Sequence, residues 1–150
     1  MKFAQKDAFP ACDQYIRTYI SGYCSVCNQV ADAFRTVCEN NRLAEQALTF
    51  GMNPLIHIGD VRYNINGQFR GRSGGPLHTV FINHRVAEQY EDENRWDIFE
   101  STVLHEMVHW ARFHAGKPSQ YRNEEAGKAF EKLAYGRDIA CGCYTMCEII

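Results

Sequence analysis

The chain has 150 residues, the usual size of one domain, and 45% of them are hydrophobic, which is enough to form a core. Sixteen Lys and Arg residues against 18 Asp and Glu residues give a net charge of −2. This balance argues against a nucleic-acid-binding protein, which normally carries a basic excess. Apolar stretches fall far short of the roughly 20 residues that span a bilayer, and charges and Pro10 interrupt the start. We therefore expect neither a membrane span nor a signal peptide.

The first half of the chain predicts helices followed by strands. Residues 13–50 are rich in helix formers and carry apolar side chains at helical spacing. Short β-branched and aromatic runs then predict three strands of a small antiparallel sheet, at residues 55–58, 61–65 and 79–83. A Gly-rich stretch at 71–76 predicts a flexible loop before the third strand.

The second half predicts a return to helices. A polar helical stretch follows the last strand, and two strong helices are expected at residues 96–114 and 123–135, separated by Pro118 and Ser119. Helices, a small sheet and two further helices together indicate an α+β fold. We expect one domain that covers residues 1–150.

The first of these two helices contains the motif His105-Glu106-Met107-Val108-His109. Two histidines four residues apart lie on one helix face, so both imidazoles can bind a single Zn²⁺. Glu106 is the only charged residue between positions 101 and 111, on a helix with apolar residues on most sides. A buried carboxylate is costly without a partner, and a metal site would supply one. We expect Glu106 to accept a proton from a zinc-activated water.

A catalytic zinc usually takes a third protein ligand. On a helical wheel for residues 123–135, Glu131 and Glu124 share a flank with Gly127, where another element can approach closely. Glu131 is the first choice for third ligand and Glu124 the alternate, while a surface role for both stays open. Glu125 falls on the opposite side, where an exposed pair with Lys128 would explain it.

Tyr135, at the end of the same helix, is a candidate hydrogen-bond donor to a tetrahedral oxyanion. The alternative for this residue is an ordinary buried aromatic side chain.

Seven cysteines are many for this length, and the number is odd; they are Cys12, Cys24, Cys27, Cys38, Cys141, Cys143 and Cys147. Three interpretations stay open: buried free thiols, disulfides, or a structural metal that includes the Cys24/Cys27 pair. Disulfides would indicate an oxidising compartment, although the chain shows no signal peptide.

The segment around the motif, Leu104-His-Glu-Met-Val-His-Trp110, and the helix that ends Phe130-Glu-Lys-Leu-Ala-Tyr-Gly136 resemble the zincin metallopeptidase toxins of bacterial polymorphic-toxin and type VI secretion systems. The resemblance covers residues 98–136. It implies a zincin fold whose active-site helix lies under a small mixed sheet, with an edge strand that binds an extended peptide. It also implies that His105 and His109 are zinc ligands, that Glu106 is the general base and that a Glu of the second helix is the third ligand.

The resemblance further implies a zinc endopeptidase that acts on a peptide or protein substrate as an antibacterial effector. A cognate immunity protein and a secretion-system carrier would be its partners, and we expect no nucleic acid. Injection would bring the protein to the periplasm of a target cell without a signal peptide; the alternative location is the cytoplasm. The strand at 79–83, or the hairpin before it, is expected to pair with the substrate main chain.

Two other functions stay open. One is a catalytically inactive zincin-like domain that acts as an interaction protein, and the other is a cysteine–zinc binding module.

Overall fold

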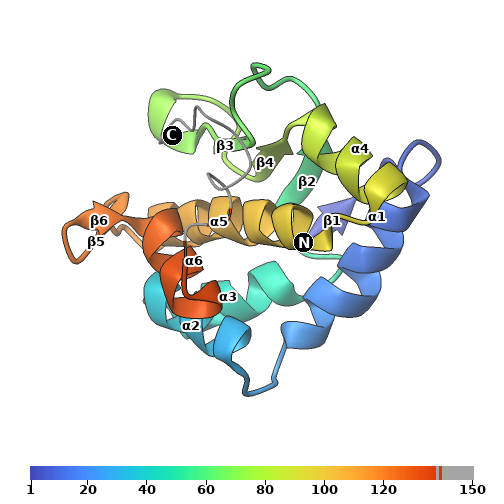
Figure 1. The fold of residues 1–150 in the computed structure, drawn as a ribbon. Coiled ribbons are helices and arrows are strands. Elements are labelled where there is room, and N and C mark those ends of the chain that lie inside the picture. Colours follow the sequence, from blue (N-terminus) through green and yellow to red (C-terminus); the bar gives the residue numbers. More distant parts are fainter. Residues whose placement is uncertain (138, 140–150) are drawn as a thin grey trace.

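A long helix, α5 (Trp96–His114), runs through the middle of the molecule (Figure 1). In this computed structural model, which describes residues 1–137 and 139, every residue of α5 from 98 to 112 is buried. A sheet covers one side of α5, and α2 (Gln29–Cys38), α3 (Asn41–Leu48) and α6 (Ala126–Tyr135) lie on the other side (Figure 1). The boundaries of α5 are those that the apolar pattern predicts.

The described residues form an α+β fold with six α-helices, as predicted. The remaining elements, in chain order, are β1 (Lys2–Phe3), α1 (Pro10–Tyr15), the π-helix η1 (Ile16–Ile20), the 3₁₀-helix η2 (Ser21–Tyr23), β2 (Leu55–Ile58), β3 (Gly67–Phe69), the 3₁₀-turn η3 (Gly71–Ser73), β4 (Thr79–Ile82), α4 (His84–Glu93), β5 (Gln120–Tyr121) and β6 (Glu124–Glu125).

Asparagine side chains begin three of the helices. Asn28, Asn40 and Asn83 each accept a hydrogen bond from a backbone N–H in the first turn of α2, α3 and α4, respectively. Such caps satisfy amide groups that have no partner within the helix. The helical region expected at residues 13–50 is therefore divided into short helices, and their apolar faces enter the core together with α5.

The main sheet is mixed and has the strand order β1-β2-β4-β3. β2 runs parallel to β1 and β4, whereas β3 is antiparallel to β4 and forms one edge. The strand pattern in the sequence predicts an antiparallel sheet, whereas the resemblance to zincin toxins implies a mixed sheet. The structure has the mixed sheet. Since β4 has a strand on each side, it offers no free edge to a substrate, contrary to our expectation for residues 79–83. The free edge on this side of the sheet belongs to β3.

The strand expected at residues 61–65 is absent, and the strand lies a few positions later, at β3. The run forms a turn in which the Ile65 N–H donates to the Arg62 carbonyl. The side-chain amide of Asn83 donates to the carbonyls of Arg62 and Ile65, so local hydrogen bonds replace those of a sheet.

Candidate metal centre

Three buried side chains from two elements converge at the middle of α5. His105 and His109 come from successive turns of α5, and Glu125 comes from the residue that precedes α6. Their candidate ligand atoms lie within 4.8 Å of one another, and this is the one such group found among the described residues. His105 Nε2 lies 3.4 Å from Glu125 Oε1, and His109 Nε2 approaches the same oxygen still more closely.

The donor set and the distance between His105 Nε2 and Glu125 Oε1 fit a metal ion. His109 Nε2 is buried and has no partner with hydrogen-bond geometry, although Glu125 Oε1 is beside it. Two ligands of a tetrahedral zinc at about 2.0–2.2 Å lie about 3.3 Å apart, close to the distance between His105 Nε2 and Glu125 Oε1. Two imidazoles and one carboxylate also form the donor set of a catalytic zinc site with one open position.

Glu125 reaches this position because it caps α6 and is not part of it. Its carboxylate accepts hydrogen bonds from the backbone N–H groups of Gly127 and Lys128, at 3.0 and 2.8 Å. A tight turn with positive φ at Arg122 and Asn123 joins β5 to β6 and delivers Glu125 to the helix start. The expectation that Glu125 is exposed is wrong: the residue is 8% exposed.

The predicted ligands Glu131 and Glu124 are not members of this group of three. Glu131 is fully buried, and its Oε2 lies 2.9 Å from His105 Nδ1, the ring nitrogen that faces away from Glu125. Glu124 forms an ion pair with Lys132 at the surface. The structure therefore groups Glu125 with the two histidines, and the two glutamates chosen from the helical wheel are outside that group.

Glycines allow the close approach of neighbouring elements to the site. A Cβ atom at Gly127 would collide with the imidazole of His105, which confirms that another element packs closely at this position. A Cβ atom at Gly67 of β3 would lie 2.9 Å from Cγ of Glu106 and 2.8 Å from Thr102. Both β3 and α6 can therefore contact α5 only because these residues have no side chain.

Glu106 lies beside the three converging groups. It is 4% exposed, its Oε1 lies 3.9 Å from His105 Nε2, and its Oε2 has no hydrogen-bond partner in the described part of the chain. Burial raises the pKa of Glu106 to about 8; the charge of His105 opposes this shift, and the carboxylates of Glu125 and Glu131 favour it. A carboxyl group with one free oxygen and a pKa near neutrality is suited to accepting and returning a proton.

The histidines and Glu125 form one electrostatic unit. Burial acts to lower the pKa of His105, but Glu125, Glu131 and Glu106 hold it well above the ordinary value. Burial would raise the pKa of Glu125, yet the charge of His105 and contacts with both rings hold it below the usual range. Burial, followed by the charge of His105, lowers the pKa of His109.

Tyr135 points to a different group. Its hydroxyl donates to Glu100 Oε2 at 2.7 Å, and the hydroxyls of Tyr15 and Tyr23 donate to Oε1 of the same carboxylate. Tyr135 is half-buried in a tyrosine cluster around Glu100, which is where the structure places its hydroxyl.

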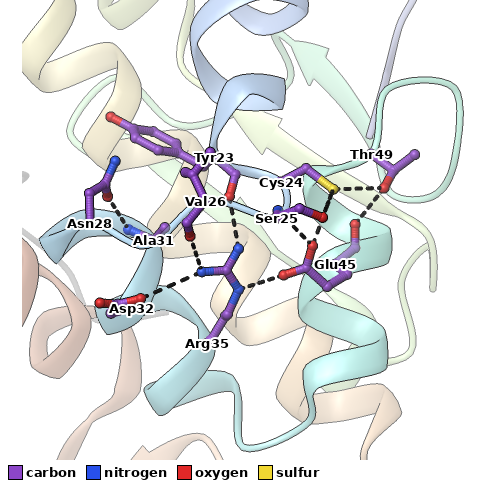
Figure 2. Close-up of polar contacts among 10 residues, drawn as sticks. All are labelled: Tyr23, Cys24, Ser25, Val26, Asn28, Ala31, Asp32, Arg35, Glu45 and Thr49. Atoms are coloured by element: carbon purple, nitrogen blue, oxygen red, sulfur yellow. Dashed lines mark hydrogen bonds and ion pairs between the residues drawn. The ribbon is translucent and has the colours of Figure 1, made fainter.

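Cys24 belongs to a separate polar network, which Figure 2 shows, whereas its predicted partner Cys27 is exposed. Cys24 Sγ donates to Glu45 Oε2 at 3.1 Å, and Arg35 binds both Glu45 and the backbone carbonyls of Tyr23 and Val26. Among the described residues, no third metal-binding group joins this pair. The four cysteines in that part of the chain are free, while those at 141, 143 and 147 lie outside the described residues.

An HExxH helix within an α+β fold, with a carboxylate from the next helix start, is the arrangement of a metallopeptidase. A comparison with protein families gives the same result: a family profile described as metallopeptidase toxin 3 matches residues 5–136. The chain belongs to this family, which makes it a metallopeptidase toxin domain. Comparisons with curated proteins and with solved structures found no significant match. None of the described helices combines the length and apolar character of a membrane span.

Proposed function

We propose that the protein is a zinc endopeptidase in which His105, His109 and Glu125 hold the metal and Glu106 is the general base. The observation that carries this proposal is the convergence of three buried ligand groups beside Glu106, whose Oε2 has no hydrogen-bond partner among the described residues. The choice of Glu125 replaces the order expected from the sequence, in which Glu131 came first and Glu124 second.

Each group has a distinct part in the proposed reaction. Zinc would supply Lewis-acid polarisation of the scissile carbonyl and activation of water. Glu106 would take the proton from the attacking water and return it to the nitrogen of the departing amine. Glu131 would hold the His105 ring through Nδ1, which fixes the tautomer that presents Nε2 to the metal.

The substrate main chain would lie along the outer edge of β3. This strand pairs with β4 on one side only, and Gly67 brings it against Glu106. An extended peptide added to such an edge forms main-chain hydrogen bonds, as in other cases of strand addition.

The test of this function is the isosteric substitution Glu106→Gln. We expect the variant to keep about one zinc per chain, by elemental analysis, and to lose at least about 10²-fold in peptide hydrolysis, because general-base assistance typically contributes 10²–10⁴-fold. Glu93→Gln, at an exposed position of α4, is the matched control and should retain full activity.

An active Glu106→Gln protein would exclude this mechanism. If the unmodified protein holds zinc yet cleaves no unfolded protein substrate, the chain is instead an inactive zincin-like binding domain.

We also propose that the domain acts as an antibacterial effector in the periplasm of a target cell, delivered by a secretion system and neutralised in its producer by an immunity protein. Membership of a toxin family supports this role. At least one disulfide that involves Cys141, Cys143 or Cys147 would be expected there, because the periplasm is oxidising. Toxicity only when the protein is directed to the periplasm is the expected result.

A further inference from the structure

A small pocket adjoins the candidate metal centre. It has a volume of about 230 Å³ and is lined by Phe69, Arg72, Ser73, His109 and Ser119. His109 belongs to both the metal centre and the pocket wall, so a group in this pocket lies next to the reacting bond. Its volume is below the roughly 300–1,000 Å³ of typical ligand sites, which suits a single side chain or a chain end.

The chemistry of the pocket favours an anion. Its lining contains one permanent cation, Arg72, the hydroxyls of Ser73 and Ser119, and no carboxylate. The Ser73 hydroxyl donates to the Arg70 carbonyl, so Arg72 and Ser119 are the groups that can donate to a ligand. Phe69 supplies an apolar wall and is 5% exposed. Hydroxyls and a guanidinium bind carboxylate oxygens well, whereas Arg72 would repel an incoming lysine or arginine.

Arg72 is held in place while most of its donors stay available. Nη2 donates to the carbonyl of Lys117 at 2.6 Å, and the guanidinium lies 5.6 Å from the ring centre of Phe113. These contacts join η3 to the end of α5 and to the loop after it. Within the described residues, this is the one hydrogen bond that the Arg72 guanidinium, with its five N–H donors, makes.

We propose that the Arg72 pocket is a specificity subsite that selects a carboxylate next to the scissile bond. This inference rests on the proposed peptidase function. The carboxylate has two possible sources, an Asp or Glu side chain or the free C-terminus of the substrate, and the same guanidinium would bind either in a two-pronged geometry. The first source agrees with the proposed endopeptidase, whereas the second would make the protein a carboxypeptidase with the same metal centre.

The first experiment maps cleavage sites. The zinc-loaded full chain is incubated with a peptide mixture made from denatured proteins, half of it amidated at the C-termini, and new ends are identified by mass spectrometry. We expect a carboxylate at one fixed place relative to the cleaved bond. Enrichment of Asp and Glu in both halves identifies the side chain, and cleavage confined to free-acid peptides identifies the C-terminus.

Substitutions then assign this preference to Arg72. Arg72→Gln should lower kcat/KM for acidic substrates by about 10–100-fold and leave neutral ones nearly unchanged. Arg72→Glu should shift the preference towards Lys and Arg. Arg42→Gln, at an exposed position of α3, is the control and should retain the native preference. An unchanged acidic preference in Arg72→Gln, or none in the active native protein, would overturn the proposal.

A binding measurement separates this proposal from the peptidase function. The measurement is the shift of the Arg72 Nε–H signal in ¹⁵N-labelled protein. An amidated peptide that contains Glu tests the side-chain carboxylate, and a free-acid peptide without acidic side chains tests the C-terminus. An amidated Gln peptide is the control. A shift with a carboxylate peptide in a protein that cleaves nothing supports the pocket and refutes the peptidase. Cleavage without any such shift refutes the pocket alone.

Discussion

Glu125 and Glu131 approach His105 from opposite ring nitrogens, and this difference separates their roles. Glu125 lies near Nε2, where both histidines converge, whereas Glu131 contacts Nδ1 from a fully buried position. A carboxylate on the far nitrogen of a metal-bound histidine orients the ring and increases its basicity. Substitution of the two residues should therefore have effects of different size.

We expect Glu125→Gln to abolish tight zinc binding, because it removes the anionic ligand. Glu131→Gln should weaken binding by about 10–100-fold, as is typical for an orienting partner, and should still reach one zinc per chain at saturation. Glu124→Gln, which alters only a surface ion pair, should bind like the native protein. Competition titrations with a chelator measure all three affinities. A larger loss in Glu131→Gln than in Glu125→Gln would restore the order expected from the sequence.

The motif residues were predictable, whereas the third group was not. The spacing of His105 and His109 fixes their common face on any helix, so their convergence follows from the sequence. The helical wheel puts Glu125 on the wrong side because it assumes that residues 123–125 are helical. The backbone of Glu125 has φ −56° and ψ 129°, which is not helical. Glutamate is also an uncommon helix cap. Asn123 before it was the available signal for a turn.

At the scale of elements, α6 is positioned on α5 by the absence of one side chain. Gly127 lies against the His105 ring, and Glu131 contacts the same ring one turn later. Glycine within a helix costs about 0.5–1 kcal/mol relative to alanine. Its presence in α6 is explained by this close approach.

Gly127→Ala should therefore disturb the metal site even though alanine favours a helix. We expect zinc affinity to fall by at least tenfold, comparable to the loss of an orienting partner, because the ring of His105 must move. Gly22→Ala is the control, since nothing lies within 4 Å of its added methyl group. Zinc titration and thermal unfolding of both variants test this expectation; unchanged affinity in Gly127→Ala would contradict the packing described.

Long, buried elements could be predicted from the sequence, and short ones could not. The 19-residue helix α5 was predicted with its boundaries because apolar side chains surround it. The strand expected at 61–65 failed because the Asn83 side chain supplies hydrogen bonds that periodicity does not reveal. Two-residue strands such as β1, β5 and β6 are too short to produce a pattern.

At the scale of the whole molecule, one buried carboxylate links distant parts of the chain to the helix of the site. Glu100 of α5 is 1% exposed and accepts hydrogen bonds from Tyr15 of α1, Tyr23 of η2 and Tyr135 of α6. Burial, together with the neighbouring carboxylate, raises the pKa of all three tyrosines. The cluster therefore holds helices from both ends of the described chain against α5.

Tyr135→Phe should lower the free energy of unfolding by about 1–3 kcal/mol, the loss of one hydrogen bond to a charged group, and leave kcat nearly unchanged. Because the pKa values of these tyrosines are higher in the folded protein than in the unfolded chain, unfolding releases protons once the pH exceeds the ordinary tyrosine pKa of 10. The free energy of unfolding should therefore fall as the pH rises above 10. It should fall less steeply in the variant, which lacks one of the three hydroxyls. Denaturant titrations at pH 8 and 11 measure both effects. A loss of 10²–10³ in kcat would instead support the oxyanion role.

The cysteines of the described chain differ strongly in accessibility. Cys12 and Cys38 are fully buried, and burial raises the pKa of both thiols. Cys24 is half-buried in its contact with Glu45, and Cys27 is exposed. Since the thiolate is the reactive form, these four thiols should react in two groups.

We expect a thiol reagent to label Cys27, and Cys24 more slowly, in the folded protein, and to label Cys12 and Cys38 only after unfolding. The proposed disulfide, at least one that involves Cys141, Cys143 or Cys147, would leave at most five of the seven thiols reactive in unfolded, unreduced protein and seven after reduction. Mass spectrometry of alkylated protein counts them directly. Such a bridge would add up to a few kcal/mol of stability, typically about 2–4, in an oxidising compartment. Seven reactive thiols without reductant, together with equal toxicity in the cytosol, would argue for an intracellular peptidase instead.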